Sequence, residues 1–395
     1  MTLNELAKEI GIEKYDALPS GMFRYYPIPE EHKSELCSME MIERLQKNFD
    51  LFGKYYDTVR ECWLATEANE NVKTYLDVAG LFTKYGSYPE ISRIKSLHPD
   101  GTPLTNMFHL FIHLPAVEAA YELYVKRGFP EEEARNYFHC YQGNIAATER
   151  SCGYPAISRG YFSWLCHYIK TLLFATGGFN FDLHPYRHAT ILKNKKSGVI
   201  QPVCANLPIH RSGLVLGSAG MEDEEGSFVG EFEETDDAYI AYPAENLRYQ
   251  NKKVVYPKEE WEILMKAGDD SIGVHIPRGA DITPEAFRAA LASAKEIVKT
   301  RYPDWSPKMF TCGSWLLSGE LNELIKPESK ILSFAGCFTR FPIKDAGKSA
   351  LSFIFPGQSK LPIEELPDDT SLMRAIKKHY LDGKFVYMYG GVIEL

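Results

Sequence analysis

The sequence predicts an α+β protein in which an N-terminal helical domain is followed by a mixed-sheet α/β domain. Up to about residue 150, apolar residues recur at three- and four-residue spacing, which is the period of helices that bury one face. From Phe179 onward, short alternating or apolar runs between Gly, Asn and Pro replace that period and indicate strands. Beyond about residue 255, strand and helix patterns alternate, which is typical of a sheet covered by helices.

Length and charge narrow the class of protein. The 395 residues exceed one ordinary core, so two domains are expected. A hydrophobic content of 45% with 25% charged residues is typical of a folded globular protein. The net charge of −9 argues against nucleic acid as a partner, because phosphate backbones are bound by clustered Lys and Arg.

The cysteine pattern and the hydropathy of the chain predict the cellular compartment of the protein. Eight cysteines are scattered without a C-x-x-C pair, and the chain shows no signal-peptide pattern, so a reduced, cytoplasmic protein is expected. The longest apolar candidate for a membrane span, residues 168–175, contains Lys170 and is far shorter than the roughly 20 residues a span needs. No membrane partner is therefore expected, and the residues do not define an oligomeric state.

The helical domain is expected over residues 1–152. Thr2 and Glu5 have the spacing of a capping box and predict a short first helix. Further helices are predicted at 39–52, 106–127 and 130–150. Gly153-Tyr154-Pro155 interrupts the pattern and places the domain boundary near Cys152, after which an apolar helix is predicted at 161–176.

The second domain, residues 153–395, carries the sheet. Strands are predicted at 179–183, 189–193 and 199–203, and a hairpin joins 227–233 to 238–242. The alternating region then predicts helices at 259–266, 284–300, 319–325 and 371–381, and strands at 272–276, 309–312, 331–334, 351–355 and 385–389. The helix at 284 places Phe287, Leu291, Ala294 and Val298 on one stripe, as in a helix that covers a sheet.

Residues 272–285 read as a strand, a tight loop and a helix start. Thr283 is suited to cap the helix, and Pro284 suits its first position. Backbone N–H groups and the positive end of the helix dipole converge at such a joint, so it is predicted to cradle a phosphate or pyrophosphate, with Arg278 as an added donor and Gly279 allowing close approach. Asp281 would repel that anion, and the alternative is a joint that binds nothing.

Cys312 and Ser314 are candidate catalytic residues. They lie where a strand ends before a helix, a position from which side chains often face a ligand crevice. A nucleophile needs a positioned base, and His275 ends the preceding strand, so the two lie close if the strands are neighbours. The alternative is that Cys312 is a small buried hydrophobe and Ser314 a turn residue.

Two pairs of histidines have a spacing that is compatible with a metal site, but other features of such a site are missing. The pairs His109/His113 and His184/His188 have the i, i+4 spacing that permits shared ligation. Neither pair contains the Glu of H-E-x-x-H and no third ligand is marked, so no metal is expected. The sequence also lacks a G-x-S-x-G elbow, a Walker loop and a G-x-G-x-x-G fingerprint.

With these residues in view, the second half resembles a bacterial family of acyltransferase domain-containing proteins, in which an N-acyltransferase-type N-terminal domain precedes a GNAT-like C-terminal domain. The similarity covers about residues 255–395. The matching strings are His275-Ile276-Pro277-Arg278-Gly279, Thr283-Pro284-Glu285-Ala286, Cys312-Gly313-Ser314-Trp315-Leu316-Leu317, Pro327-Glu328-Ser329-Lys330-Ile331-Leu332-Ser333-Phe334 and Asp369-Thr370-Ser371-Leu372-Met373-Arg374-Ala375-Ile376.

The resemblance implies a GNAT-like sheet that takes acyl-CoA or acetyl-CoA as cosubstrate in a V-shaped opening between two parting strands. The strand ending at Ile276 would pair with the pantetheine arm, and Arg278, Gly279 and Ala280 would hold the pyrophosphate. Cys312 and Ser314 would lie near the thioester. Only Arg278-Gly279-Ala280 echoes the usual GNAT phosphate loop, and Gly313 stands where His is expected in relatives.

The function that follows is an acyltransferase moving an acyl group from acyl-CoA to a small-molecule amine by direct attack, with the proton of the amine removed either by His275 as the base or through water. A second enzymatic route uses Cys312 as an acyl-carrying nucleophile. The alternative from another class is a non-catalytic GNAT-like binding or scaffold protein, which the incomplete phosphate loop favours.

Overall fold

The computed structural model describes residues 1–359 and 361–395, and its contacts divide the chain into two compact units, Met1–Phe174 and Ala175–Leu395. The sequence analysis placed the division near Cys152. Helix α10 (Arg159–Ile169) belongs instead to the first unit, because it packs on α7 (Phe108–Lys126) through ring contacts such as His109 with Phe162.

The first unit is helical, as predicted. Its other helices are α1 (Leu3–Glu9), α2 (Met39–Phe49), α3 (Tyr56–Glu67), α4 (Glu70–Tyr85), α5 (Tyr88–Ile91), α6 (Pro103–Asn106), α8 (Glu131–Asn136) and α9 (Cys140–Cys152). The predicted capping box at Thr2 is present, with Glu5 closing it. Every residue of 108–117 in α7 is buried, so this helix forms the centre of the unit's core.

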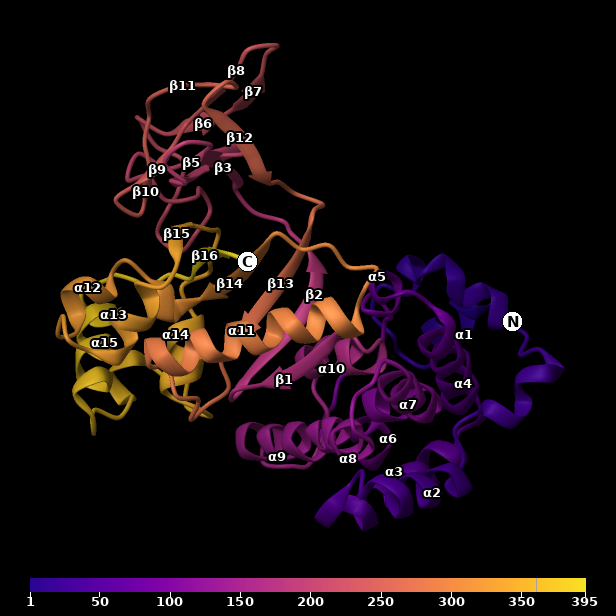
Figure 1. Cartoon of the computed structure of the whole chain (residues 1–395). Coiled ribbons are helices and arrows are strands. Elements are labelled where there is room, and N and C mark those ends of the chain that lie inside the picture. The colour runs from indigo at the N-terminus through magenta and orange to yellow at the C-terminus, as the bar shows by residue number, and fades with distance from the viewer. Residues whose placement is uncertain (360) are drawn as a thin grey trace. The chain divides into compact units, whose positions relative to one another are not determined.

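The second unit is built on a six-stranded sheet (Figure 1). The strand order is β1 (Leu173–Thr176), β2 (Phe179–Pro185), β13 (Asp270–His275), β14 (Met309–Ser314), β16 (Tyr389–Glu394) and β15 (Thr339–Pro342). Strands β13 and β14 run parallel, whereas β13 with β2, β14 with β16 and β15 with β16 are antiparallel. The fold is therefore a helical region followed by a mixed-sheet α/β domain, which confirms the predicted class.

Between β2 and β13 the chain forms a set of small antiparallel sheets. Their strands are β3 (Thr190–Asn194), β4 (Ile200–Val203), β5 (Leu207–Ile209), β6 (Phe228–Gly230), β7 (Phe232–Glu234), β8 (Ala238–Ala241), β9 (Ala244–Glu245), β10 (Arg248–Tyr249), β11 (Val254–Pro257) and β12 (Trp261–Met265). The predicted hairpin is present as β7 with β8, while β6 pairs with β5.

One face of the six-stranded sheet is covered by α11 (Pro284–Arg301), as its apolar stripe predicts (Figure 1). The ring of Phe287 lies 5.2 Å from that of Phe179 on β2 and 4.8 Å from that of Phe334. The helices that follow are α12 (Leu321–Leu324), α13 (Lys330–Ala335), α14 (Ser349–Ile354) and α15 (Ser371–Leu381), and they enclose a separate apolar cluster around Trp315 and Ile376.

Several predicted elements are wrong. Residues 261–265 form β12, which pairs with β3, rather than a helix. Residues 331–334 and 351–355 fall in or next to α13 and α14 rather than in strands. The predicted helix at 161–176 ends at Ile169 because Thr171 takes a left-handed conformation (φ 51°) before β1 begins. The last strand is displaced and runs over Tyr389–Glu394.

Candidate functional site at the opening between two parallel strands

Strands β13 and β14 part shortly after they meet. Their parallel pairing consists of Ile272 with Phe310 and Gly273 with Thr311. Beyond these pairs β13 stays hydrogen-bonded to β2 as far as His275, and β14 stays paired with β16 as far as Ser314. Because each strand follows its outer neighbour, the sheet opens between them, and backbone groups on the inner edges are left for another partner.

The register decides which side chains share a face. Residues two apart on a strand point the same way, and residues paired across strands share a face. His275 therefore lies on the face of Gly273, Asp182 and Thr311. Cys312 alternates with Thr311 and lies on the opposite face, with the residues that α11 covers.

His275 is held by a buried carboxylate. Its Nε2 lies 2.8 Å from Asp182 Oδ1, and the other oxygen of Asp182 lies 3.1 Å from Nδ1 of His184. The Asp182 side chain is 5% exposed, whereas that of His275 is 42% exposed. A buried carboxylate between two imidazoles fixes their orientation, while part of the His275 side chain stays at the surface.

Gly273 makes this arrangement possible. A Cβ at this position would lie 2.0 Å from Asp182 Oδ1 and 2.6 Å from His184 Cε1, distances at which atoms overlap. The absence of a side chain on β13 therefore provides the space in which the carboxylate sits.

A cavity of about 220 Å³ lies over this face. Among the residues lining it are His184, Tyr186, His188, His275, Thr311 and Phe341. Burial lowers the pKa of His188, and the charges of His184 and Arg187 lower it further, so His188 is neutral at pH 7. The cavity thus combines the His275 imidazole with the neutral imidazole of His188.

The predicted Cys312 and Ser314 do not join His275. Burial raises the pKa of the Cys312 thiol to about 12, and the side chain faces away from His275. Ser314 Oγ accepts a hydrogen bond of 3.2 Å from the Leu316 amide and caps a short 3₁₀ turn. The structure therefore places His275 and Cys312 beside the opening, but it points the Cys312 side chain to the face opposite His275.

The loop after Ile276 is only partly available to an anion. The Ala280 amide donates to the Pro277 carbonyl at 3.1 Å, and the Thr283 amide donates to Asp281 at 3.1 Å. The Thr283 side chain makes no capping bond, contrary to the prediction, although Pro284 opens the helix as expected.

Two parts of the loop stay accessible. Gly279 has a φ of 87° and is exposed, with open space where a Cβ would stand. Arg278 is exposed and reaches the Phe353 carbonyl with one Nη2–H at 3.3 Å. Its remaining donors are the ones that an anion at this loop would meet.

The histidine pair of the first unit is structural. His109 lies 2.7 Å from both Ser96 Oγ and the Ile157 carbonyl, and His113 stacks on Phe162. Burial lowers the pKa of each to about 3. Within residues 1–359 and 361–395, no group of three or more His, Cys, Asp or Glu residues is arranged to hold a metal ion. Over the same residues, no helix has both the length and the apolar content to cross a bilayer.

Sequence reasoning missed Asp182 and His184 as partners of His275. The sequence did indicate that Asp182 and His184 share one face of a strand, because Phe179, Phe181 and Leu183 alternate with Asn180, Asp182 and His184. The pairing of β2 with β13 was not visible, since more than eighty residues of small sheets separate the two strands.

The geometry defines a mixed-sheet protein with an exposed histidine, backed by a carboxylate, beside an opening between parallel strands. Residues 177–393 match the family of GNAT-like C-terminal domains, and the chain belongs to this family.

Solved structures share the whole fold. An acyltransferase mutant in complex with octanoyl-CoA has a TM-score of 0.66 at 16% sequence identity. An acyltransferase in complex with decanoyl-CoA and teicoplanin has a TM-score of 0.64 at 17% identity. An acyltransferase in complex with CoA and 10C-teicoplanin has a TM-score of 0.63 at 16% identity. Each comparison covers 100% of both chains. A comparison with proteins of curated function finds no match.

Proposed function

We propose that this protein transfers an acyl group from acyl-CoA to the amine of a small-molecule acceptor. The observation that carries the proposal is the parting of β13 and β14 with the His275–Asp182 pair on the face beside it. Membership of the GNAT-like family supports it, and so does the shared fold with acyltransferases that bind decanoyl-CoA, octanoyl-CoA and teicoplanin.

The donor lies in the opening. Amides of an extended pantetheine arm pair with the inner edge of β13 beyond Gly273, as an added strand would. Its pyrophosphate lies at the loop, against the Arg278 side chain and the Gly279 amide, while the Ala280 amide is already used. Of the predicted contacts for the cosubstrate, Ile276, Arg278 and Gly279 are retained in this proposal.

The chemistry is direct attack. The acceptor nitrogen forms a bond to the thioester carbonyl carbon, and the bond from that carbon to sulfur breaks, so CoA leaves as a thiolate. Because Asp182 accepts a hydrogen bond from His275 Nε2, the basic lone pair of His275 is on Nδ1 and takes the proton of the attacking amine. That proton then neutralises the thiolate through solvent.

The route through an acyl-Cys312 intermediate has less support. Thiolates are the reactive form of cysteine, and burial raises the pKa of this thiol to about 12. The proposed base cannot activate the Cys312 thiol, because the side chain of His275 points to the opposite face of the sheet.

Release of CoA thiol tests the function. The protein is incubated with acetyl-, octanoyl- or decanoyl-CoA and a panel of primary amines that includes teicoplanin, and a thiol reagent follows the free CoA. We expect amine-dependent release that His275→Gln lowers about a hundredfold or more, since a general base contributes roughly 10²–10⁴-fold.

His98→Gln is the matched control, because His98 is exposed in the helical unit. Calorimetry with CoA separates the outcomes. Binding of CoA without turnover for any amine would refute the proposed acyl transfer, and absence of CoA binding by folded protein would favour the scaffold alternative.

A further inference from the structure

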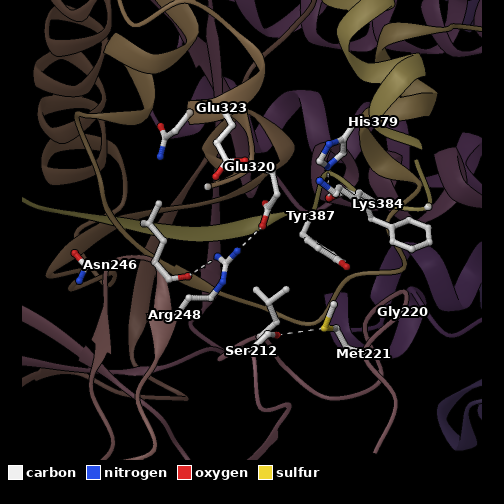
Figure 2. A pocket seen from close by; sticks show the side chains of 16 residues that line it. Ser212, Gly220, Met221, Asn246, Arg248, Glu320, Glu323, His379, Lys384 and Tyr387 are labelled. Carbon is white, nitrogen blue, oxygen red and sulfur yellow. Dashed lines mark hydrogen bonds and ion pairs between the residues drawn. The ribbon is translucent and has the colours of Figure 1, made fainter. Parts of the chain in front are cut away.

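A second, larger cavity lies in the same unit, away from the opening. It has a volume of about 590 Å³, and its lining includes Ser212, Leu214, Met221, Leu247, Phe385 and Tyr387 (Figure 2). The lining residues come from the small sheets, from the segment 319–323 at α12, from His379 in α15 and from the chain between α15 and β16. None of its lining residues belongs to the cavity beside His275, so the acyl-transfer proposal does not use it.

A serine at the wall of this cavity is linked to a histidine and a carboxylate. Ser212 Oγ lies 2.8 Å from His210 Nδ1, and His210 Nε2 is bonded to Glu224 Oε1. The His210 side chain is 9% exposed, while Ser212 is exposed and lines the cavity. The order hydroxyl, imidazole, carboxylate is the one that activates a serine nucleophile on unrelated folds.

The hydrogen bonds also fix where the proton of His210 lies. The Ser212 amide donates to Nδ1 at 3.1 Å, so Nδ1 must be the acceptor. The carboxylate of Glu224 accepts from Nε2, which must therefore carry the hydrogen. The lone pair of Nδ1 is therefore shared between the Ser212 amide and the Ser212 hydroxyl, and Nδ1 is the ring nitrogen that can take the hydroxyl proton.

Two neighbouring side chains, Met221 and Arg211, also contact this group, and neither replaces the hydrogen bonds of His210 to Ser212 and Glu224. Ser212 Oγ also lies 3.4 Å from Met221 Sδ, but thioether sulfur is a weak acceptor and the imidazole nitrogen is the stronger one. Arg211 Nε lies 2.6 Å from the same Glu224 oxygen and forms an ion pair with that carboxylate. The pair of charges holds Glu224 in place behind His210.

The turn that carries Ser212 is rigid. The Gly213 amide donates to the His210 carbonyl at 2.8 Å, and Gly213 has a φ of 81°. A Cβ on Gly213 would lie 2.7 Å from the Tyr249 carbonyl oxygen, so the turn is pressed against β10. Such packing holds the serine and histidine in one geometry.

Another part of the cavity wall carries strained backbone. Leu247 adopts a φ of 63°, a left-handed conformation that is unfavourable for a non-glycine residue. The Arg248 guanidinium donates to the Leu247 carbonyl at 2.9 Å and to Glu320 at 2.8 Å, which holds the turn (Figure 2). The result is an apolar side chain presented to the cavity.

We propose that Ser212 is the nucleophile of a second site, which hydrolyses carboxylic esters with an apolar acyl group. The apolar lining, Leu214, Met221, Leu247 and Phe385, receives the acyl group. The Gly220 amide, next to Met221, has no acceptor among the described residues and is assigned to the developing oxyanion.

The reaction balances without a cofactor. Ser212 Oγ bonds to the carbonyl carbon while its proton passes to His210 Nδ1; the bond to the alcohol oxygen breaks, and that oxygen takes the proton from Nδ1. Water then adds to the acyl-Ser212 ester with His210 as base, and the proton returns to Ser212 as the carboxylic acid leaves. One ester and one water give one acid and one alcohol.

A fluorophosphonate probe and p-nitrophenyl butyrate test the site on the full chain. We expect a covalent adduct that peptide mass spectrometry places on Ser212, and p-nitrophenol release that Ser212→Ala abolishes. His210→Asn should slow both reactions about a hundredfold, because it removes the base. Glu224→Gln should lower the rate less, since it keeps a hydrogen-bond acceptor for Nε2.

Ser197→Ala is the matched control, because Ser197 is exposed at the hairpin tip between β3 and β4. Thermal unfolding checks that each variant folds, and His275→Gln should leave both readouts unchanged, which separates this proposal from acyl transfer at the opening. Absence of an adduct on Ser212 in folded protein, or ester hydrolysis that persists in Ser212→Ala, would overturn the proposal.

Discussion

Replacing Gly273 by alanine tests the site most directly, because the change adds one methyl group and removes no functional atom. The new Cβ would stand 2.0 Å from Asp182 Oδ1 and 2.6 Å from His184 Cε1. Neither atom is at the end of a long, flexible side chain, and Asp182 is buried. The carboxylate must therefore move away from β13, and its hydrogen bond to His275 Nε2 is lost or lengthened.

The size of the effect follows from that bond. A hydrogen bond to a charged group contributes about 1.5–3 kcal/mol, so losing it only in the transition state slows turnover roughly 10- to 150-fold. Overpacking a buried site costs about 1–3 kcal/mol of unfolding free energy, which lowers the melting temperature of a unit of this size by about 2–12 °C. We expect kcat to fall roughly 10- to 150-fold, as the lost hydrogen bond predicts, with a smaller change in KM.

Amine-dependent CoA release measures the first quantity, and thermal unfolding measures the second. Gly143→Ala is the control, because Gly143 lies in α9 of the other unit with open space around it. This change adds the same methyl group, favours the helix by up to about 1 kcal/mol, and should leave CoA release unchanged.

A double-mutant cycle gives the refuting result. If Gly273→Ala acts by misplacing the His275–Asp182 pair, it should add little to the loss already caused by His275→Gln. Full additivity, or a wild-type rate in a folded Gly273→Ala protein, would show that this pair does not support the reaction.

Two further outcomes are expected. Cys312→Ala should keep acyl transfer within about threefold of the wild-type rate, because direct attack needs no covalent intermediate; complete loss in folded protein would restore the acyl-cysteine route. In the helical unit, burial raises the pKa of Glu35, but hydrogen bonds from His32, Lys84 and Tyr85 outweigh it and lower the pKa from 4.5 to about 2. Ionised Glu35 therefore adds stability that is fully present above pH 4.5 and lost as pH falls towards 2, so thermal unfolding of Glu35→Gln should vary less with pH over that interval; equal slopes would contradict this.

Long, periodic helices and the positions at which helices start were predictable because their signals are local. The capping box at Thr2, the helix after Thr283 and the helix over Ser371–Leu381 were all expected from a few adjacent residues. Short apolar runs were not, because a run of four or five residues fits a strand or a buried helix equally well. Ser329 does mark the start of α13, since its Oγ accepts a hydrogen bond from the Leu332 amide, and that signal was outweighed by the apolar run.

The site was harder because it depends on pairing between distant strands. His275 was a candidate from its position at a strand end, but its partner Asp182 lies on β2, across the small sheets β3 to β12. No local pattern predicts that Gly273 faces Asp182. The loop after Ile276 was found from sequence, whereas the use of the Ala280 amide within it depends on a turn that the sequence did not define.

The expected pairing of Cys312 with His275 shows how much depends on one residue of register. Both residues do lie beside the opening, on neighbouring strands, as the sequence suggested. Successive residues of a strand point to opposite faces, so pairing Gly273 with Thr311 places Thr311 and His275 on one side and Cys312 on the other. A shift by one residue would have faced the thiol to the imidazole. The observed register instead faces His275 to Asp182, and a base with a carboxylate behind it suits attack by an external amine rather than by a nucleophile of the protein.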